Sequence, residues 1–146
     1  WNGACMVPEI FSREKITKLK ERYPKAKLLS HPECEDVILK MADYIGSTTG
    51  LLKYATKSPE NEFIVATEAG IIHQMQKDNP DKLFIPAPPN NNCACNDCPH
   101  MKRNTLEKLY LCMKNELPEI TVPKDIIEKA VIPIERMLDI SARLGL

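Results

Sequence analysis

The chain has 146 residues, and its 20 basic and 20 acidic side chains give a formal net charge of zero and a pI near 7.0. This balance argues against nucleic acid or an anionic membrane surface as partners, because both select clustered positive charge. No window approaches the ~18 unbroken apolar residues of a membrane helix. The first residues lack both an initiator Met and the features of a signal peptide, so we interpret the chain as a processed or truncated piece.

Helical and strand-like segments alternate along the first part of the chain. A helix is predicted from Ser12 to Tyr23, where Ser12 can cap the first turn and Pro24 ends the helix. The other expected elements are, in order, strand 26–30, a helix with Val37, Ile38 and Met41 on its apolar face, strand 43–45, a helix opened by 46–50, strand 62–66, helix 70–77, strand 82–85, helix 105–115 and helix 124–142. We expect Pro133 to kink the last helix.

This alternation predicts an α/β fold, in which a parallel sheet carries helices on both faces. Ligands of such sheets bind beyond the carboxyl ends of the strands. The residues that we expect at this edge are His31, Glu33, Ser47, Thr48 and a cysteine loop that begins at Cys93.

The cysteine loop follows a Pro/Asn-rich segment, 86–92, and runs from Cys93 to Pro99. Its three thiols, Cys93, Cys95 and Cys98, are spaced closely enough to converge on a soft metal or to form a redox pair. A Cys followed directly by Pro is also typical of iron–sulfur ligand runs. A metal or redox function is therefore predicted for this loop.

Three other readings of the cysteines are less favoured. A thioredoxin-like pair would follow the first strand at a helix N-terminus, whereas this run comes late in the chain. A zinc site made of Cys93, Cys95, Cys98 and His100 would be crowded for a tetrahedron. A disulfide scaffold would be shorter and richer in loops. A cluster that uses only some of the local thiols is the best remaining option, and it fits a reducing compartment.

Two polar motifs at the strand edge have both a plain and a functional interpretation. His31-Pro32-Glu33 is either a surface turn or an acid/base pair. Ser47-Thr48 is either a helix N-cap or a site where hydroxyls and free amides hold a phosphate or carboxylate. Of the remaining thiols, Cys34 is ambiguous, and Cys112 is expected in a helix core beside apolar residues.

The order of the motifs closely resembles the C-terminal half of the quinolinate synthases, the NadA-type enzymes. Seven blocks carry the resemblance: 3–5 (Gly-Ala-Cys), 31–34 (His-Pro-Glu-Cys), 46–54, 63–75, 93–102, 104–110 and 133–138. They occur in the family's order and cover essentially the whole chain.

The resemblance implies a three-layer αβα sandwich that is one of three similar domains around a pseudo-threefold axis. One cysteine of each domain binds a 4Fe–4S cluster that keeps one iron open. Cys5 matches the ligand of the middle domain and Cys98 that of the third, while the first domain's cysteine has no counterpart in this chain. Cys34 is not a family ligand, and Cys93 and Cys95 are extra thiols that form a regulatory disulfide or have no role. Many members carry His where this chain has Pro8.

The implied domain organisation is 1–25 as the end of the middle domain and a connecting helix, 26–102 as the third α/β domain, and 103–146 as C-terminal helices. The implied enzyme is a cytoplasmic transferase that condenses iminoaspartate with dihydroxyacetone phosphate to quinolinate in NAD biosynthesis, with L-aspartate oxidase as pathway partner. Glu33 is the expected general acid/base, His31 binds a substrate oxygen, and Ser47 and Thr48 hold a carboxylate or phosphate.

The sequence leaves one alternative function open, and the resemblance implies one further expectation for the chain alone. The alternative function is a non-catalytic zinc or iron–sulfur module, which predicts that His31 and Glu33 lie far from Cys98. The chain alone, which lacks one cluster ligand and the other domains, is expected to be inactive, to bind no stable cluster, and to fold mainly from Ala26 onward with residues 1–11 mobile.

Overall fold

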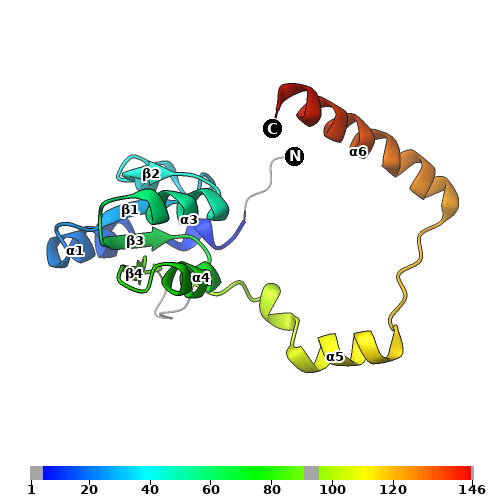
Figure 1. Cartoon of the computed structure of the whole chain (residues 1–146), viewed down its shortest axis with the longest axis horizontal. Helices are drawn as coiled ribbons and strands as arrows, with labels where there is room; N and C mark the ends of the chain where they lie inside the picture. Colours follow the sequence, from blue (N-terminus) through cyan, green and yellow to red (C-terminus); the bar gives the residue numbers. More distant parts are fainter. Residues whose placement is uncertain (1–4, 91–95, 146) are drawn as a thin grey trace. The chain divides into compact units, whose positions relative to one another are not determined.

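The computed structural model describes residues 5–90 and 96–145. The chain divides into two compact units, Trp1–Arg103 and Asn104–Leu146, which we call unit 1 and unit 2 and describe separately. Unit 1 holds a sheet with its helices, and unit 2 holds two helices and their connector (Figure 1). In the described part of the chain, no helix is both long and apolar enough to cross a membrane.

A parallel sheet of four strands forms the middle of unit 1, in the order β2-β1-β3-β4 (Figure 1). The strands are β1 (Lys27–Ser30), β2 (Tyr44–Ile45), β3 (Glu62–Ala66) and β4 (Leu83–Pro86). Leu29 of β1 is in register with Tyr44 of β2 on one side and with Val65 of β3 on the other. The chain leaves β1 toward β2 and then crosses back to β3, so the topological switch point lies between β1 and β3.

Alternate residues of the central strands β1 and β3 are buried in two separate hydrophobic cores. Leu28 and Ile64 are fully buried in the first core, which also contains residues of α1 (Arg13–Arg22) and α2 (Asp36–Leu39). Their neighbours Leu29 and Val65 are fully buried in the second core with residues of α3 (Thr48–Lys57) and α4 (Gly70–Asp78). Because successive strand side chains point to opposite faces, this division gives three layers. The predicted αβα sandwich with a short parallel sheet is confirmed.

The segment before the first helix is packed, and the prediction that residues 1–11 are mobile is wrong for its described part. Val7 and Phe11 are 2% and 1% exposed and belong to the first core, and Phe11 pairs with Pro89 in an isolated bridge. The short 3₁₀ helix Pro8–Ile10 lies between them. Such long-range contacts leave no local pattern in the sequence, so the burial of Val7 and Phe11 was not predicted. Residues 1–4 lie outside the described part.

The first helix begins where the sequence predicts it. The Ser12 hydroxyl accepts a hydrogen bond from the Lys15 amide (3.3 Å), and Ile16 is fully buried. The second helix is shorter than expected, since α2 has one turn only. Val37 is 41% exposed and Met41 follows the helix, so Ile38 alone of the three predicted apolar residues is a buried helical side chain.

Unit 2 contains α5 (Leu106–Asn115) and α6 (Lys124–Leu144), near the predicted bounds, with Pro133 inside α6. A 3₁₀ helix, Met101–Arg103, ends unit 1 just before them. The expectation that Cys112 is buried is wrong in this structure, because every residue of α5 is exposed. An amphipathic pattern predicts which face of a helix is apolar, but it does not tell which other segment packs against that face.

Candidate functional site at the carboxyl edge of the sheet

A cavity of about 190 Å³ lies at the carboxyl edge of the sheet. Its lining residues are Cys5, Val7, Pro8, His31, Glu33, Thr48, Thr67, Glu68, Cys98 and Met101. His31 follows β1 and Thr67 follows β3, so the cavity lies beyond the switch point between these two strands. This is the position at which open parallel sheets bind ligands.

His31 and Glu33 are held at the end of β1 by the sheet itself. The His31 amide donates to the Ala66 carbonyl (3.1 Å), which continues the β1–β3 ladder by one residue. The Glu33 amide donates to His31 Nδ1 (3.3 Å), and Nδ1 lies 3.9 Å from Glu33 Oε2. The shorter contact assigns Nδ1 as an acceptor, so in neutral His31 the proton is on Nε2. The imidazole can then donate from Nε2 to an oxygen of a ligand.

The two residues of the Ser-Thr motif have different positions. Ser47 is the N-cap of α3, where its hydroxyl accepts from the Gly50 amide (3.2 Å), and it does not line the cavity. Thr48, the first residue of α3, does line it. A hydroxyl at a helix N-terminus is suited to an anionic group. Ser47 is therefore a helix cap, whereas Thr48 is the residue of this motif that can contact a ligand in the cavity.

Thr67 and Glu68 line the cavity although the motif analysis did not single them out. They follow β3, the strand with the clearest apolar pattern, and therefore lie at the edge where ligands were expected. That signal was available in the sequence. It was missed because a Thr-Glu pair matches no metal or nucleophile motif.

Cys5 and Cys98 line the same cavity although 93 positions separate them in the sequence. The segment before Cys98 is anchored by Asn96, whose side chain is 1% exposed. The Asn96 side-chain amide donates to the Ala87 carbonyl, and its backbone carbonyl accepts from the Ala69 amide (3.2 Å). Cys93 and Cys95 lie outside the described residues. Asn96 thus ties the segment just before Cys98 to the end of β4 and to the start of α4.

The donor set fits part of a metal centre. Cys5 and Cys98 each contribute a thiol to the lining of one cavity. Thiolates are the usual ligands of iron–sulfur clusters. Among residues 5–90 and 96–145, no group of three or more His, Cys, Asp or Glu side chains could hold a metal ion. Those residues therefore offer two thiol ligands at this edge, and a complete centre would need at least one more ligand.

Cys34 is not part of the cavity lining. Its thiol is 5% exposed, belongs to the first core and donates to the Ala66 carbonyl (Sγ–O 3.5 Å). Burial raises the pKa of the Cys34 thiol, and a neutral buried thiol is a poor ligand and a poor nucleophile. The ambiguous thiol of the sequence is therefore a core residue.

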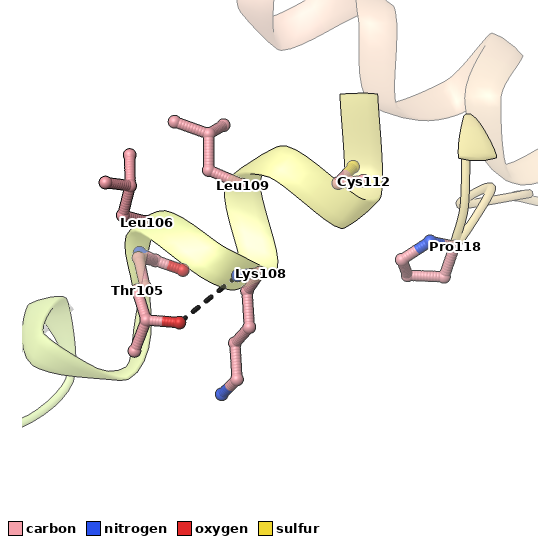
Figure 2. A pocket seen from close by; sticks show the side chains of 7 residues that line it. Thr105, Leu106, Lys108, Leu109, Cys112 and Pro118 are labelled. Carbon is pink, nitrogen blue, oxygen red and sulfur yellow. Dashed lines mark hydrogen bonds between the residues drawn. The ribbon is translucent and has the colours of Figure 1, made fainter. Parts of the chain in front are cut away.

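A larger hollow, of about 700 Å³, lies in unit 2 along α5 (Figure 2). It is lined by Asn104, Thr105, Leu106, Lys108, Leu109, Cys112 and Pro118. None of the predicted site residues is among them. Figure 2 marks one hydrogen bond between the residues drawn, the helix cap from the Lys108 amide to the Thr105 hydroxyl (3.2 Å). Size alone does not identify the site, so the smaller cavity with its converging polar groups is the candidate.

Comparison with known proteins agrees with the family resemblance of the sequence motifs. The family model described as "Quinolinate synthetase A protein" matches residues 1–139. The quinolinate synthases of Microcystis aeruginosa and Gloeothece citriformis are each 62% identical over 141 residues, which is 97% of this chain and 44% of each relative. That of Chloroherpeton thalassium is 59% identical over 142 residues. The chain thus spans less than half the length of these relatives. It belongs to the quinolinate synthetase A family.

Proposed function

We propose that the full-length protein containing this chain is a quinolinate synthase of NAD biosynthesis. It would condense iminoaspartate, supplied by L-aspartate oxidase, with dihydroxyacetone phosphate, and would release phosphate and two waters. The observation that carries the proposal is the cavity of unit 1, where His31 and Glu33 from the end of β1 meet Cys5 and Cys98 from distant segments. Family membership and the names of the relatives support the same activity.

Cys5 and Cys98 would hold two corners of a 4Fe–4S cluster, and a cysteine outside this chain would hold the third. When bound, such a cluster with one open iron supplies a Lewis acid that polarises a hydroxyl or carbonyl oxygen. Both cysteines line a cavity that also contains a carboxylate and an imidazole. The fit of these donors supports the cluster, and among the described residues no third thiol lines this cavity.

The side chains of the cavity would have separate roles in dehydration and ring closure. Glu33, whose side chain is half exposed and 3.9 Å from the imidazole, is free to exchange protons with substrate carbons. His31 would donate from Nε2 to a substrate oxygen, because Nδ1 already accepts from the Glu33 amide. The Thr48 hydroxyl at the start of α3 would hold a carboxylate or phosphate, with Ser47 fixing the first turn of that helix.

A Glu33→Gln variant of the full-length protein tests this assignment. It keeps the size of the side chain and removes its ability to exchange protons, so turnover should fall by about 10²- to 10⁴-fold under anaerobic conditions, while iron and sulfide contents stay normal. Glu35→Gln is the matched control, because Glu35 is exposed, lies two residues away and does not line the cavity. Near-normal turnover of Glu33→Gln would make Glu33 a turn residue only.

The 146-residue chain by itself is expected to form no quinolinate, because it offers two of the three proposed cluster ligands. A non-catalytic metal module, the alternative, predicts that His31 and Glu33 lie far from Cys98. Their presence around one cavity favours the enzyme instead. Quinolinate formation by the purified chain, supplied with both substrates under anaerobic conditions, would contradict the need for the missing ligand.

A further inference from the structure

Glu68 gives the cavity a second carboxylate, and it lies directly after a buried strand. It follows β3, in which Phe63, Ile64, Val65 and Ala66 are fully buried. Thr67, the residue between the strand and Glu68, is 3% exposed. Strand ends anchored in a packed core hold side chains more accurately than free loops do. The position of Glu68 at the cavity is therefore set by the core of the sheet.

A backbone amide holds the carboxylate itself. Glu68 Oε2 accepts a hydrogen bond from the Gly70 amide (2.7 Å) at the first residue of α4. A Cβ atom at position 70 would lie 2.7 Å from the same oxygen, which is too close for the carboxylate to stay in place. The hydrogen-only side chain of Gly70 is thus what allows this arrangement. Glu33, by contrast, has a half-exposed side chain that faces an imidazole across 3.9 Å.

A fixed carboxylate can accept hydrogen bonds and attract positive charge, and it repels anions. Both substrates of the proposed reaction carry anionic groups, namely two carboxylates on iminoaspartate and a phosphate on dihydroxyacetone phosphate. The nitrogen of iminoaspartate is the substrate group that carries N–H donors and can be cationic. Charge complementarity therefore pairs Glu68 with this nitrogen.

We propose that Glu68 is a substrate-binding residue whose carboxylate, held by the Gly70 amide, accepts a hydrogen bond from the nitrogen of iminoaspartate and so orients that substrate. The inference rests on the proposed function and extends it. It gives the two carboxylates of the cavity separate roles: Glu33 moves protons, and Glu68 fixes the position of the nitrogen.

The test uses Glu68→Gln in the full-length protein, assayed anaerobically with each substrate varied in turn. The Gln oxygen can still accept from the Gly70 amide, so the start of α4 and the thermal stability should be kept, while the negative charge is lost. A charge-assisted hydrogen bond of ordinary strength corresponds to a rise of about 10- to 100-fold in KM for iminoaspartate. The KM for dihydroxyacetone phosphate and the iron and sulfide contents should change little.

Gly70→Ala gives an independent test, since it displaces the Glu68 carboxylate without changing any charge. Only the end of a flexible side chain must move, and Ala favours a helix, so the variant should fold and show the same selective rise in KM. Glu62→Gln is the matched control, because Glu62 is at the opposite end of β3 and does not line the cavity. It should behave as the wild type.

Each result has one meaning. Unchanged KM values in Glu68→Gln, in a preparation where wild type is active and Glu33→Gln is not, would overturn the role of Glu68 and leave the proposed function standing. A rise in KM for dihydroxyacetone phosphate alone would also overturn it, because Glu68 would then face the other substrate. Inactivity of the wild type, with its cluster intact, would instead contradict the proposed function itself.

Discussion

The two units of this chain differ in how far their apolar side chains are buried. In unit 1, Leu28, Phe63 and Ile64 are fully buried between a sheet and its helices. In unit 2, α5 and α6 are equally regular helices, yet Leu106 is 83% exposed and Ile134 is 51% exposed. Regular secondary structure is thus common to both units, whereas a packed core is described only within unit 1.

The difference explains why the candidate site lies in unit 1. A binding site needs side chains held in fixed positions, and the buried strands β1 and β3 fix His31 and Glu68 at the edge of the cavity. Most helical stability in proteins comes from packing of an apolar face rather than from intrinsic propensity. The apolar side chains of α5 and α6 are exposed within unit 2, so the buried apolar packing described in this structure lies in unit 1.

A pair of substitutions, one in each unit, should differ strongly in its effect on stability. Ile64→Ala removes a fully buried side chain from β3 and should lower the free energy of unfolding of the 146-residue chain by about 2–5 kcal/mol. Ile134→Ala changes a half-exposed side chain of α6 and should shift it by no more than about 0.5 kcal/mol. Urea unfolding followed by circular dichroism measures both.

Equal losses of stability in these two variants would contradict the difference in packing between the units. They would mean that α6 packs as tightly as β3 in solution. A large loss of stability for Ile134→Ala in the full-length protein, but not in this chain, would show that residues outside this chain pack against α6.

The helix caps provide a second, smaller comparison with nearly identical local chemistry. Ser12 caps α1 by accepting from the Lys15 amide at 3.3 Å, and Thr105 caps α5 by accepting from the Lys108 amide at 3.2 Å. Ser12→Ala should destabilise unit 1 by about 1 kcal/mol, because α1 is part of its core. Thr105→Ala should reduce helix content without moving the main unfolding transition. A matching shift from both variants would show that the two units unfold together.

The stability of unit 1 should also depend on pH, to a smaller degree. Burial alone would raise the pKa of Asp43, but the Leu28 amide (2.7 Å) and the ammonium groups of Lys20 and Lys27 outweigh it and hold this pKa below its ordinary value of 3.8. A carboxyl with a lowered pKa stabilises the fold above its unfolded pKa, and this contribution disappears as the pH falls through the folded value.

Asp43→Asn tests this dependence. The variant should be less stable than the wild type at pH 7, and the difference should shrink as the pH falls below about 4. Unfolding titrations between pH 7 and pH 2 measure it, with Asp36→Asn as control, because Asp36 is an exposed carboxyl in α2 that no described contact ties to β1. A difference between wild type and Asp43→Asn that does not vary with pH would contradict the assignment.

The sequence predicted the elements that depend on local patterns. Strand β3 occupies Glu62–Ala66 as expected, because an unbroken apolar run between polar flanks has few other solutions. The first helix and its Ser12 cap were predicted for a similar local reason. The αβα layering followed from the alternation of these elements.

Features that depend on distant contacts were not predicted. The burial of Val7 and Phe11 rests on packing against the first core and on the bridge to Pro89, which no local pattern records. The exposure of Cys112 depends on what covers α5, which the helix sequence does not specify. At the site, the edge of the sheet was predicted, but Glu68 was not, because its role comes from the Gly70 amide and the cavity rather than from a motif.

Cys98 and Cys5 line one cavity at the carboxyl edge of the sheet, and counting iron in variants of the full-length protein tests whether they bind one metal centre. In the full-length protein, prepared anaerobically, Cys98→Ser should abolish iron and sulfide incorporation. Cys112→Ser, which changes an exposed thiol of α5, and Cys93→Ser should keep most of both. Equal loss of iron from Cys98→Ser and Cys93→Ser would contradict a centre shared with Cys5, since it would place the metal within the cysteine loop itself.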